Sequence, residues 1–215
     1  KHVICMLNNM QYISPMRYKP EHKEKTRALI LQQAGLLFRR KGSMGVGIDE
    51  IMNAAKLTRG GFYGYFKTKA ALFADVLTEE AGLDRMLRRR TGTTKQELLT
   101  EATEMLTGYL APENASTIET QCTLASLPAD VARSGSRIAK SAYTNKIKNL
   151  ATEFDRTRKK TGETAPEATA QPSKEALAAL VLTVGAFSIA RAIDDPDFAK
   201  ALLDAARDKA LEQLR

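Results

Sequence analysis

The sequence contains no tryptophan and only two histidines and two cysteines among its 215 residues. Both histidines, His2 and His22, lie near the beginning of the chain, so the rest offers none for a Ser–His–Asp triad or a histidine-rich metal site. The cysteines, Cys5 and Cys122, are far apart in the sequence, which indicates no disulfide framework and is typical of the reducing cytoplasm. We therefore expect a cytoplasmic protein that is not an enzyme and holds no metal or cofactor.

Long apolar runs are also missing, since no stretch reaches the roughly 18 residues that a membrane-spanning helix needs. The opening residues KHVICMLNNMQYISPM are mildly apolar, but their apolar run is too short and interrupted for a signal peptide. We interpret residues 1–19 as an extension that is expected to be flexible, with a natural start near Met16.

Positive charge is concentrated in the first third of the chain. The net charge is +8, and the first 70 residues hold thirteen Lys and Arg against four Asp and Glu, whereas the remainder holds twenty against twenty-one. A basic end on a near-neutral body indicates a polyanionic partner at that end. Charge alone leaves open a nucleic acid, a membrane surface or a merely solvated face.

Apolar residues recur mostly at helical spacing, and no segment shows a convincing strand alternation. Two stretches rich in Pro, Ala and Thr, 111–117 and 159–173, are predicted as loops. Gly42 is typical of a helix end, Thr94 and Glu97 form a capping-box pattern, and Ser173 can cap a helix. The resulting all-α chain has helices predicted over 20–41, 49–55, 58–66, 69–90, 94–110, 120–127, 136–159, 174–193 and 196–213.

Helix 49–55, turn 56–57 and helix 58–66 together have the dimensions of a helix-turn-helix. In that motif the second helix enters the major groove with its N-terminal residues first, here Thr58 and Arg59. An arginine at this place can fork onto guanine or bind a phosphate.

Two glycines and four aromatics follow in the second helix of the motif. Gly60 and Gly61 each lose about 1 kcal/mol of helix propensity relative to alanine, and they gain close approach of the backbone to base edges. Phe62 and Phe66 lie four residues apart and are expected in the core.

Polar groups for the DNA backbone follow the glycines. The hydroxyls of Tyr63 and Tyr65 suit phosphate oxygens, and Lys67 and Lys69 stand where the next helix also points its amides at an anion. The alternative is that all the aromatics are core and the lysines merely solvated. The basic excess and the preceding short helix favour DNA binding.

The segment IDEIMNAAKLTRGGFYGYFKTKAALFADVL resembles the DNA-binding region of the TetR family of transcriptional regulators, over about residues 25–77. The shared pattern is an Ile-x-x-Ile-Ala start, a Thr-x-x-x-Phe/Leu-Tyr recognition helix and then His/Tyr-Phe-x-x-Lys. The resemblance implies a regulator, most simply a repressor, that binds a near-palindromic DNA operator as a homodimer and is released by a small-molecule inducer in its C-terminal domain.

The resemblance also assigns roles to residues of the motif. The family usually has Thr or Ser where this chain has Gly47, and His where it has Tyr65. Base reading is implied for Arg59, Gly60 and Gly61, and phosphate contact for Tyr63, Tyr65 and Lys69. The full set of expected DNA contacts is Gly47, Thr58, Arg59, Gly60, Gly61, Tyr63, Tyr65, Lys67 and Lys69.

The predicted helix 174–193 is apolar nearly all round, which indicates burial on all sides. With helix 196–213 it can supply half of a four-helix bundle between two subunits, or it can be an ordinary core helix of one subunit. We favour the homodimer through these last two helices, because a two-fold operator calls for two DNA-binding domains.

Facing helices of the C-terminal part suggest a ligand pocket, although its residues are equally well explained as plain packing. Cys122 can be a reactive sensor of electrophiles or oxidants, and a small buried residue is the favoured interpretation. The candidate pocket residues are Met105, Tyr109, Cys122, Tyr143, Ile147 and Phe187.

We therefore predict an all-α protein with a three-helix helix-turn-helix DNA-binding domain over 20–68 and a helical ligand-binding and dimerisation domain over 69–215. One rival is a generic polyanion or membrane-surface binder. Another is an enzyme that uses Asp194, Asp195 and Asp197 as a metal cluster, which an acidic helix start explains more simply.

Overall fold

The computed structural model describes residues 20–79, 82–116, 122–158 and 171–215. Within these ranges the chain forms helices and no strand, which confirms the predicted all-α fold. The expected extension over 1–19 and residues 159–170 of the second predicted loop lie outside the described residues. The helices are α1 (Pro20–Lys41), α2 (Ile48–Ala54), the 3-10 helix η1 (Arg59–Gly64), α3 (Lys69–Thr78), α4 (Leu83–Arg88), α5 (Lys95–Tyr109), α6 (Pro112–Ser116), α7 (Thr123–Ser126), α8 (Pro128–Arg133), α9 (Arg137–Arg158), α10 (Lys174–Ala190) and α11 (Pro196–Leu214).

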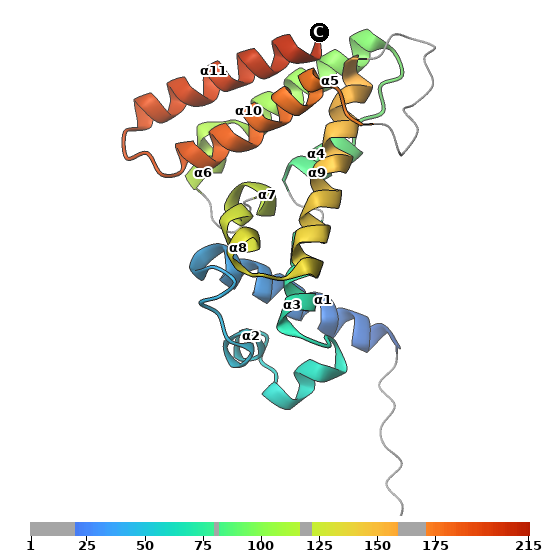
Figure 1. Ribbon diagram of the computed structural model, residues 1–215, viewed down its shortest axis with the longest axis vertical. Coiled ribbons are helices and arrows are strands. Elements are labelled where there is room, and N and C mark those ends of the chain that lie inside the picture. Colours follow the sequence, from blue (N-terminus) through green and yellow to red (C-terminus); the bar gives the residue numbers. More distant parts are fainter. Residues whose placement is uncertain (1–19, 80–81, 117–121, 159–170) are drawn as a thin grey trace, which may run out of the picture.

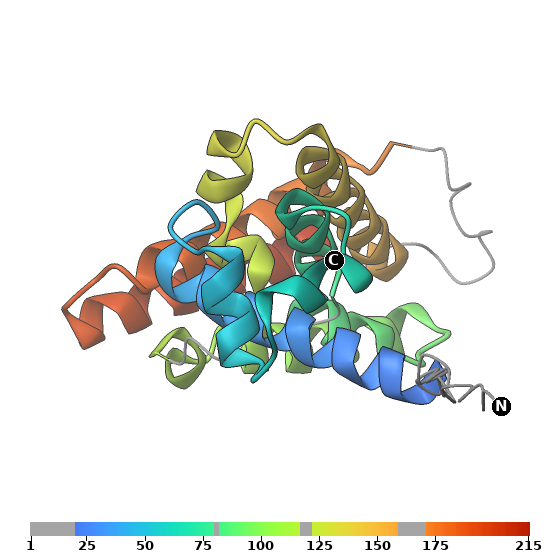
Figure 2. The same ribbon diagram turned by 90° about the horizontal axis from the view of Figure 1, so that it is seen from below.

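The molecule is elongated, with its first and last helices at opposite ends (Figure 1). Helices α1, α2, η1 and α3 form one end, which we call the head, and α4–α11 form the body. Helix α9 runs from the head to the far end, packing on α3 at the head and on α5 and α10 in the body. Seen from below, the head lies in front of the long body helices (Figure 2).

Two hydrophobic cores hold this arrangement together. The head core is built on side chains that are fully buried, among them Ile30, Phe38, Ile51, Phe62 and Leu72. It also takes in three residues from beyond the head, which are Leu127 just before α8, Val131 on α8 and Ala139 on α9. The body core packs α4, α5, α7, α9, α10 and α11 together. Because α8 and α9 contribute to the head core, the head and body are joined by buried apolar contact as well as by the chain.

Local sequence signals explain most helix ends. Gly42 ends α1 in the left-handed region, with φ of +74°. Thr94 and Glu97 form the predicted capping box at the start of α5. Hydrogen bonds from the amide of Thr94, which has the larger effect, and from the amide of Thr93 lower the pKa of the Glu97 carboxyl to about 2. Ser173 accepts from the amide of Ala176 and caps α10 as predicted.

The single helix predicted over 69–90 is wrong. Helix α3 ends at Thr78, and α4 begins only at Leu83. Gly82, just ahead of α4, has φ of +58°, which a continuous helix does not permit, and a Cβ added there would lie 3.1 Å from the Cβ of Cys122. The close approach of Cys122, a tertiary contact, therefore accompanies the break.

A buried ion pair spans this break. The ammonium of Lys146, on α9, pairs with the carboxylate of Asp84 at the start of α4 and donates to the carbonyl of Glu79 at the end of α3. The two charged side chains are only 5% and 14% exposed. One side chain of α9 thus ties together the two helix ends on either side of residues 80–81.

Other sequence predictions need smaller corrections. The helix predicted over 58–66 is the 3-10 helix η1, and the Thr58 side chain makes no capping hydrogen bond. The predicted loop 111–117 contains α6, and Pro128 opens α8 because proline suits a first helical turn. In the last two cases a proline was taken as a helix breaker, although the first turn of a helix tolerates it.

Candidate DNA-binding surface and ligand pocket

The helix-turn-helix is formed by α2 and η1, which pack against each other in the head. Phe62 and Phe66 are buried as predicted, with ring centroids 5.9 Å apart, and Ile51 and Met52 of α2 lie in the same core. The guanidinium of Arg27, on α1, lies 4.8 Å from the centroid of the Phe66 ring. The phenylalanines therefore attach η1 to the head and leave its other side facing solvent.

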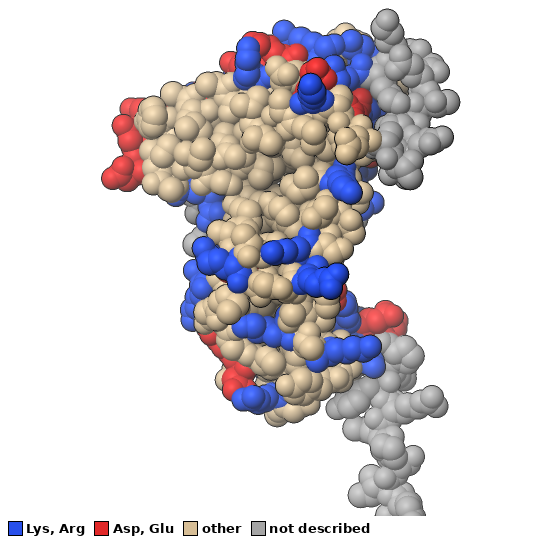
Figure 3. Space-filling view, in the orientation of Figure 1, with Lys and Arg blue, Asp and Glu red and all other residues tan. Residues whose placement is uncertain are grey.

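The solvent-facing side of η1 carries most of the expected DNA contacts. Side chains at i and i+3 eclipse in a 3-10 helix, so Gly60 and Tyr63 share one face. Tyr63 is 62% exposed, and Thr58, Arg59 and Lys67 are exposed as well. Figure 3 shows Lys and Arg side chains gathered over the lower half of the molecule, on the head and the adjoining part of the body.

Arg59 is paired in the structure. Its Nη1 lies 2.7 Å from Oδ2 of Asp49, on α2, and both side chains are largely exposed. An exposed pair of this kind contributes little to stability, on the order of 0–1 kcal/mol, so a phosphate or a guanine can compete for the guanidinium.

The glycines of the motif are not required by packing inside the protein. A Cβ added to Gly60 would meet nothing within 4 Å, and one added to Gly61 would meet Cε of Met52 at an ordinary 3.7 Å. Gly47, at the N-cap of α2, also faces open space and makes no side-chain cap. Gly60 provides exposed backbone on the surface that carries Tyr63, whereas Gly61 is half-buried and lies toward the buried Met52.

Tyr65 and Lys69 are less free than the sequence suggests. Tyr65 is half-buried and packs against the head core. The Nζ of Lys69 donates to the carbonyls of Ser43 and Val46, each at 2.9 Å. Lys69 therefore holds the turn between α1 and α2 in place, and only part of its ammonium is left to face a phosphate.

Asp130, on α8, holds the same turn from the side of the body. Its Oδ1 accepts from the buried amide of Ser43 at 2.7 Å, and the residue is buried itself. This contact cannot be predicted from sequence, because nothing in the local pattern of PADVAR distinguishes a carboxylate at a helix start from one that reaches another element. The turn before α2 is thus bound by one residue of the head and one of the body.

Asp130→Ala is expected to lower the free energy of unfolding by about 2 kcal/mol, because it leaves a buried amide without an acceptor. Asp130→Asn keeps an oxygen near the amide of Ser43 and should lose less than half of that. Urea unfolding of both variants measures the difference. Equal losses would mean that the hydrogen bond to Ser43 contributes nothing to stability.

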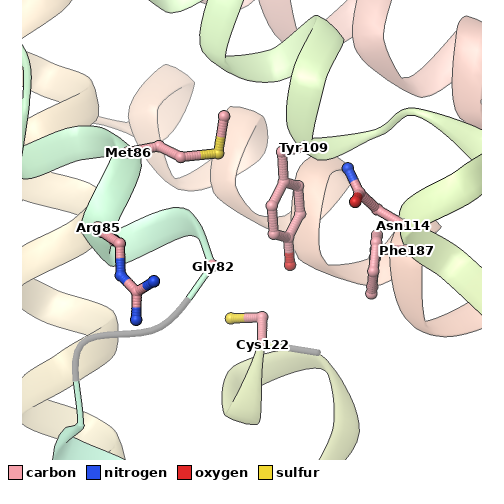
Figure 4. A pocket seen from close by; sticks show the side chains of 7 residues that line it. All are labelled: Gly82, Arg85, Met86, Tyr109, Asn114, Cys122 and Phe187. Carbon is pink, nitrogen blue, oxygen red and sulfur yellow. The ribbon is translucent and has the colours of Figure 1, made fainter. Parts of the chain in front are cut away.

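A cavity of about 230 Å³ lies in the body between α4, α5, α7 and α10 (Figure 4). Of the six candidate pocket residues, Tyr109, Cys122 and Phe187 line it. Met105 lines a separate hollow, and Tyr143 and Ile147 pack against the body core, where the Tyr143 hydroxyl donates to the carbonyl of Leu124 at 3.0 Å. The sequence analysis missed the other lining residues, which are Gly82, Arg85, Met86 and Asn114.

Four polar side chains line this cavity, those of Arg85, Tyr109, Asn114 and Cys122. The rings of Tyr109 and Phe187 stack with centroids 4.8 Å apart, and the Tyr109 hydroxyl points toward the Cys122 side chain (Figure 4). That hydroxyl is buried, and in the described part of the chain it has no partner at full hydrogen-bonding geometry, although the Cys122 thiol is close enough to act on it. Burial, with a smaller contribution from the neighbouring Cys122, raises the pKa of Tyr109 well above its usual value, so the phenol stays protonated. Cys122 is a free, buried cysteine.

The last two helices pack along each other, and the surface over them is largely uncharged in Figure 3. Leu177, Val181 and Ile189 follow one another at multiples of four along α10 and are large exposed apolar residues, with Val181 69% exposed. Gly185 falls between them in the same stripe, with nothing within 4 Å of an added Cβ. Phe198 adds a 59% exposed ring from α11.

Neither a membrane span nor a metal cluster is found in the described ranges. None of the described helices is long and apolar enough to cross a bilayer. In those same residues no three His, Cys, Asp or Glu side chains are grouped to hold a metal ion. Asp195 instead accepts from the amides of Asp197 and Phe198, which confirms the acidic start predicted for α11.

Comparison with known proteins places the head in a family. Residues 30–76 match the family model described as bacterial regulatory proteins, tetR family. An uncharacterized HTH-type transcriptional regulator of Bacillus subtilis, YfiR, is 36% identical over 69 residues, which is 32% of this chain and 33% of that protein. The match thus spans about a third of this curated relative's length.

Solved structures share the fold of the whole chain. The reduced form of NemR from E. coli has a TM-score of 0.63 at 19% identity, covering 86% of this chain and 96% of that one. A TetR-family regulator from Streptomyces coelicolor has a TM-score of 0.65 at 17% identity, covering 89% and 96%. NalD of Pseudomonas aeruginosa, described as the secondary repressor of the MexAB-OprM multidrug efflux pump, has 0.55 at 21%, covering 86% and 95%. The head, through its match over residues 30–76, therefore belongs to the tetR family of bacterial regulatory proteins, and the described residues as a whole share the fold of TetR-family regulators.

Proposed function

We propose that the protein is a cytoplasmic, non-enzymatic repressor that binds a palindromic operator as a homodimer and is released when a small molecule enters its body. Residues 20–68 are the DNA-binding domain, and residues 69–215 bind the ligand and dimerise. The observation that carries the proposal is the exposed face of η1, where uncovered glycine backbone and the hydroxyl of Tyr63 stand beside Arg59. Repression is also the role described for the structurally similar NalD.

In this proposal η1 enters the major groove with Arg59 first. Arg59 exchanges Asp49 for a guanine edge or a phosphate, and Gly60 and Gly61 let the backbone approach the bases. Thr58, Tyr63, Lys67 and the uncapped N-terminus of α2 at Gly47 contact the sugar–phosphate backbone. Tyr65 and Lys69 act partly from within, by supporting the segment that makes these contacts.

Dimerisation through α10 and α11 follows from the apolar stripe along α10. Exposed apolar patches on a folded protein usually mark an interaction surface. Gly185, in the middle of the stripe, allows a second α10 to approach closely. Two copies related by a two-fold axis would present two heads to two half-sites of an operator.

Tyr63→Phe is expected to weaken binding to every duplex by about fivefold, because it removes one phosphate hydrogen bond and no base contact. Arg59→Ala is expected to weaken binding to the preferred duplex by about tenfold or more and to relax the preference at the base pair it contacts. The operator is first selected from random duplex DNA, and affinities for it and for a scrambled duplex of the same length are then measured at several salt concentrations.

Asp49→Asn is the matched control, since it frees Arg59 without removing it and should leave the preferred sequence unchanged. The affinity of the parent should fall steeply with salt because several phosphates are neutralised. The proposal fails if both Tyr63→Phe and Arg59→Ala bind the selected duplex as tightly as the parent.

A further inference from the structure

The cavity between α4, α5, α7 and α10 has the size of a small ring compound. Its volume is about 230 Å³, and a cavity of roughly 150 Å³ in another protein holds benzene. The space therefore fits one aromatic ring with a substituent of a few atoms, and it is below the range of about 300–1,000 Å³ typical of drug-sized ligands. Large multi-ring molecules do not fit without repacking of the stacked Tyr109 and Phe187 rings.

The wall is apolar in part, and Tyr109 and Cys122 form one polar corner, with Arg85 and Asn114 on other parts of the wall (Figure 4). The ring of Phe187 and the thioether of Met86 supply apolar surface, and the Tyr109 hydroxyl and the Cys122 thiol meet at the corner. Gly82 makes this corner possible, because the Cβ of any other residue would crowd the Cβ of Cys122 at 3.1 Å.

The hydroxyl of Tyr109 is the hydrogen-bond donor in this cavity that is best placed to bind a ligand. The residue is only 4% exposed, and among the described residues its hydroxyl has no partner at full hydrogen-bonding geometry, only the nearby thiol of Cys122, which is a weak partner. A buried hydroxyl without a partner costs about 1–3 kcal/mol, which an acceptor atom on a ligand would recover. The thiol of Cys122 has to turn aside to admit that atom, and a cysteine side chain has three staggered positions available.

Charge around the cavity disfavours a cationic ligand. The guanidinium of Arg85 lines the cavity, and Arg191 is close enough to Tyr109 to lower the pKa of its phenol, against the larger opposing effect of burial. Both positive groups favour an oxygen that carries partial negative charge.

We propose that this cavity selects a small, non-cationic aromatic compound whose carbonyl oxygen accepts a hydrogen bond from Tyr109. The proposal deepens the proposed function, on which it rests for the regulatory role of the ligand. Its chemistry can be tested on the DNA-free protein.

The probes are acetophenone, cumene and α-methylbenzylamine, which have the same number of non-hydrogen atoms and nearly the same shape. Acetophenone has the carbonyl, cumene has none, and the amine is a cation at neutral pH. Binding to the full chain is followed by saturation-transfer NMR and calorimetric titration. We expect acetophenone to bind about tenfold more tightly than either of the other two.

Tyr109→Phe removes only the hydroxyl and should abolish that preference, leaving acetophenone and cumene equal. Ser188→Ala deletes another hydroxyl of the body, one that donates to the carbonyls of Ala125 and Val184, and should keep the tenfold preference. Thermal unfolding of each variant shows that it is folded. Equal binding of acetophenone and cumene to the parent, or an unchanged preference in Tyr109→Phe, would overturn the proposal.

Duplex binding and probe preference, measured separately, distinguish this proposal from the proposed function. If acetophenone binds through Tyr109 and the protein never binds a selected duplex, the repressor proposal fails and the ligand chemistry stands. If the protein binds its operator and shows no preference among the three probes, the ligand chemistry fails and the repressor proposal stands.

Discussion

Val181→Arg should leave the protein monomeric at concentrations where the parent is a dimer. Val181 is 69% exposed in the middle of the apolar stripe on α10, beside the open surface of Gly185. In a two-fold interface each substitution occurs twice, so two arginines would be buried against apolar surface and close to each other. Burying an uncompensated charge costs several kcal/mol. We therefore expect the dissociation constant of the dimer to rise at least 1,000-fold, or about 4 kcal/mol.

Sedimentation equilibrium measures this change, and Ile138→Arg is the matched control. Ile138 is also a large apolar residue, 58% exposed, but it lies at the start of α9, far along the chain from the stripe. Ile138→Arg should remain a dimer. The monomeric Val181→Arg should bind a half-site as the parent subunit does and lose about a hundredfold in affinity for the full palindrome, because the two heads are no longer linked. A Val181→Arg protein that stays dimeric would place the interface elsewhere.

The helix-turn-helix could be predicted from sequence because its determinants are local. The spacing of Ile51, Phe62 and Phe66 fixes which sides of α2 and η1 face the core, and all three are buried as expected. The kind of helix was missed, since neighbouring Gly60 and Gly61 weaken an α-helix enough for a 3-10 turn to form. That difference changes the face on which Tyr63 stands only slightly, because Gly60 and Tyr63 share a side in either geometry.

The ligand pocket could be predicted only in part. Tyr109 and Phe187 were recognised from the faces of long helices, where periodicity is a strong signal. Gly82, Arg85 and Met86 were missed because a continuous helix over 69–90 would have turned them in other directions. The break depends on Gly82 meeting Cys122 and on Lys146 binding Asp84, and these residues are 40 and 62 positions apart along the chain. Contacts at such separations leave no trace in local pattern.

Helix α9 shows that a local pattern also fails where one helix changes its surroundings along its length. Leu150 and Phe154 of α9 are buried, whereas Ile138, at the start of the same helix, is exposed. Helix α9 changes its neighbours along its length, from α3 and α8 at the head to α5 and α10 in the body. A stripe defined for the whole helix therefore cannot describe both ends.

Lys146 stands at the junction on which operator release would depend. Its ammonium is shared between the carbonyl at the end of α3, which belongs to the head, and the carboxylate of Asp84 on α4. The same short helix places Arg85 and Met86 in the cavity wall. A ligand that displaces α4 would therefore act on Asp84, and through Lys146 on the end of α3 and the orientation of the head.

Lys146→Met should lower the free energy of unfolding by about 3 kcal/mol, because it leaves the largely buried carboxylate of Asp84 without a partner. Adding Asp84→Asn should recover a substantial part of the loss, since no unpaired charge then remains.

Lys200→Met is the matched control on α11: its partner Asp204 is four residues away at 2.6 Å, both side chains are well exposed, and the cost should stay below about 0.5 kcal/mol. Urea unfolding measures the three losses in the free energy of unfolding. Titration with the operator, at a temperature where every variant is folded, measures the DNA affinity of each variant. We expect weaker operator binding from Lys146→Met and parental binding from Lys200→Met. Equal stability losses in Lys146→Met and Lys200→Met would show that the pair with Asp84 is no stronger than an exposed one, and the junction would then have to be held by the apolar contacts of α3 with α9 alone.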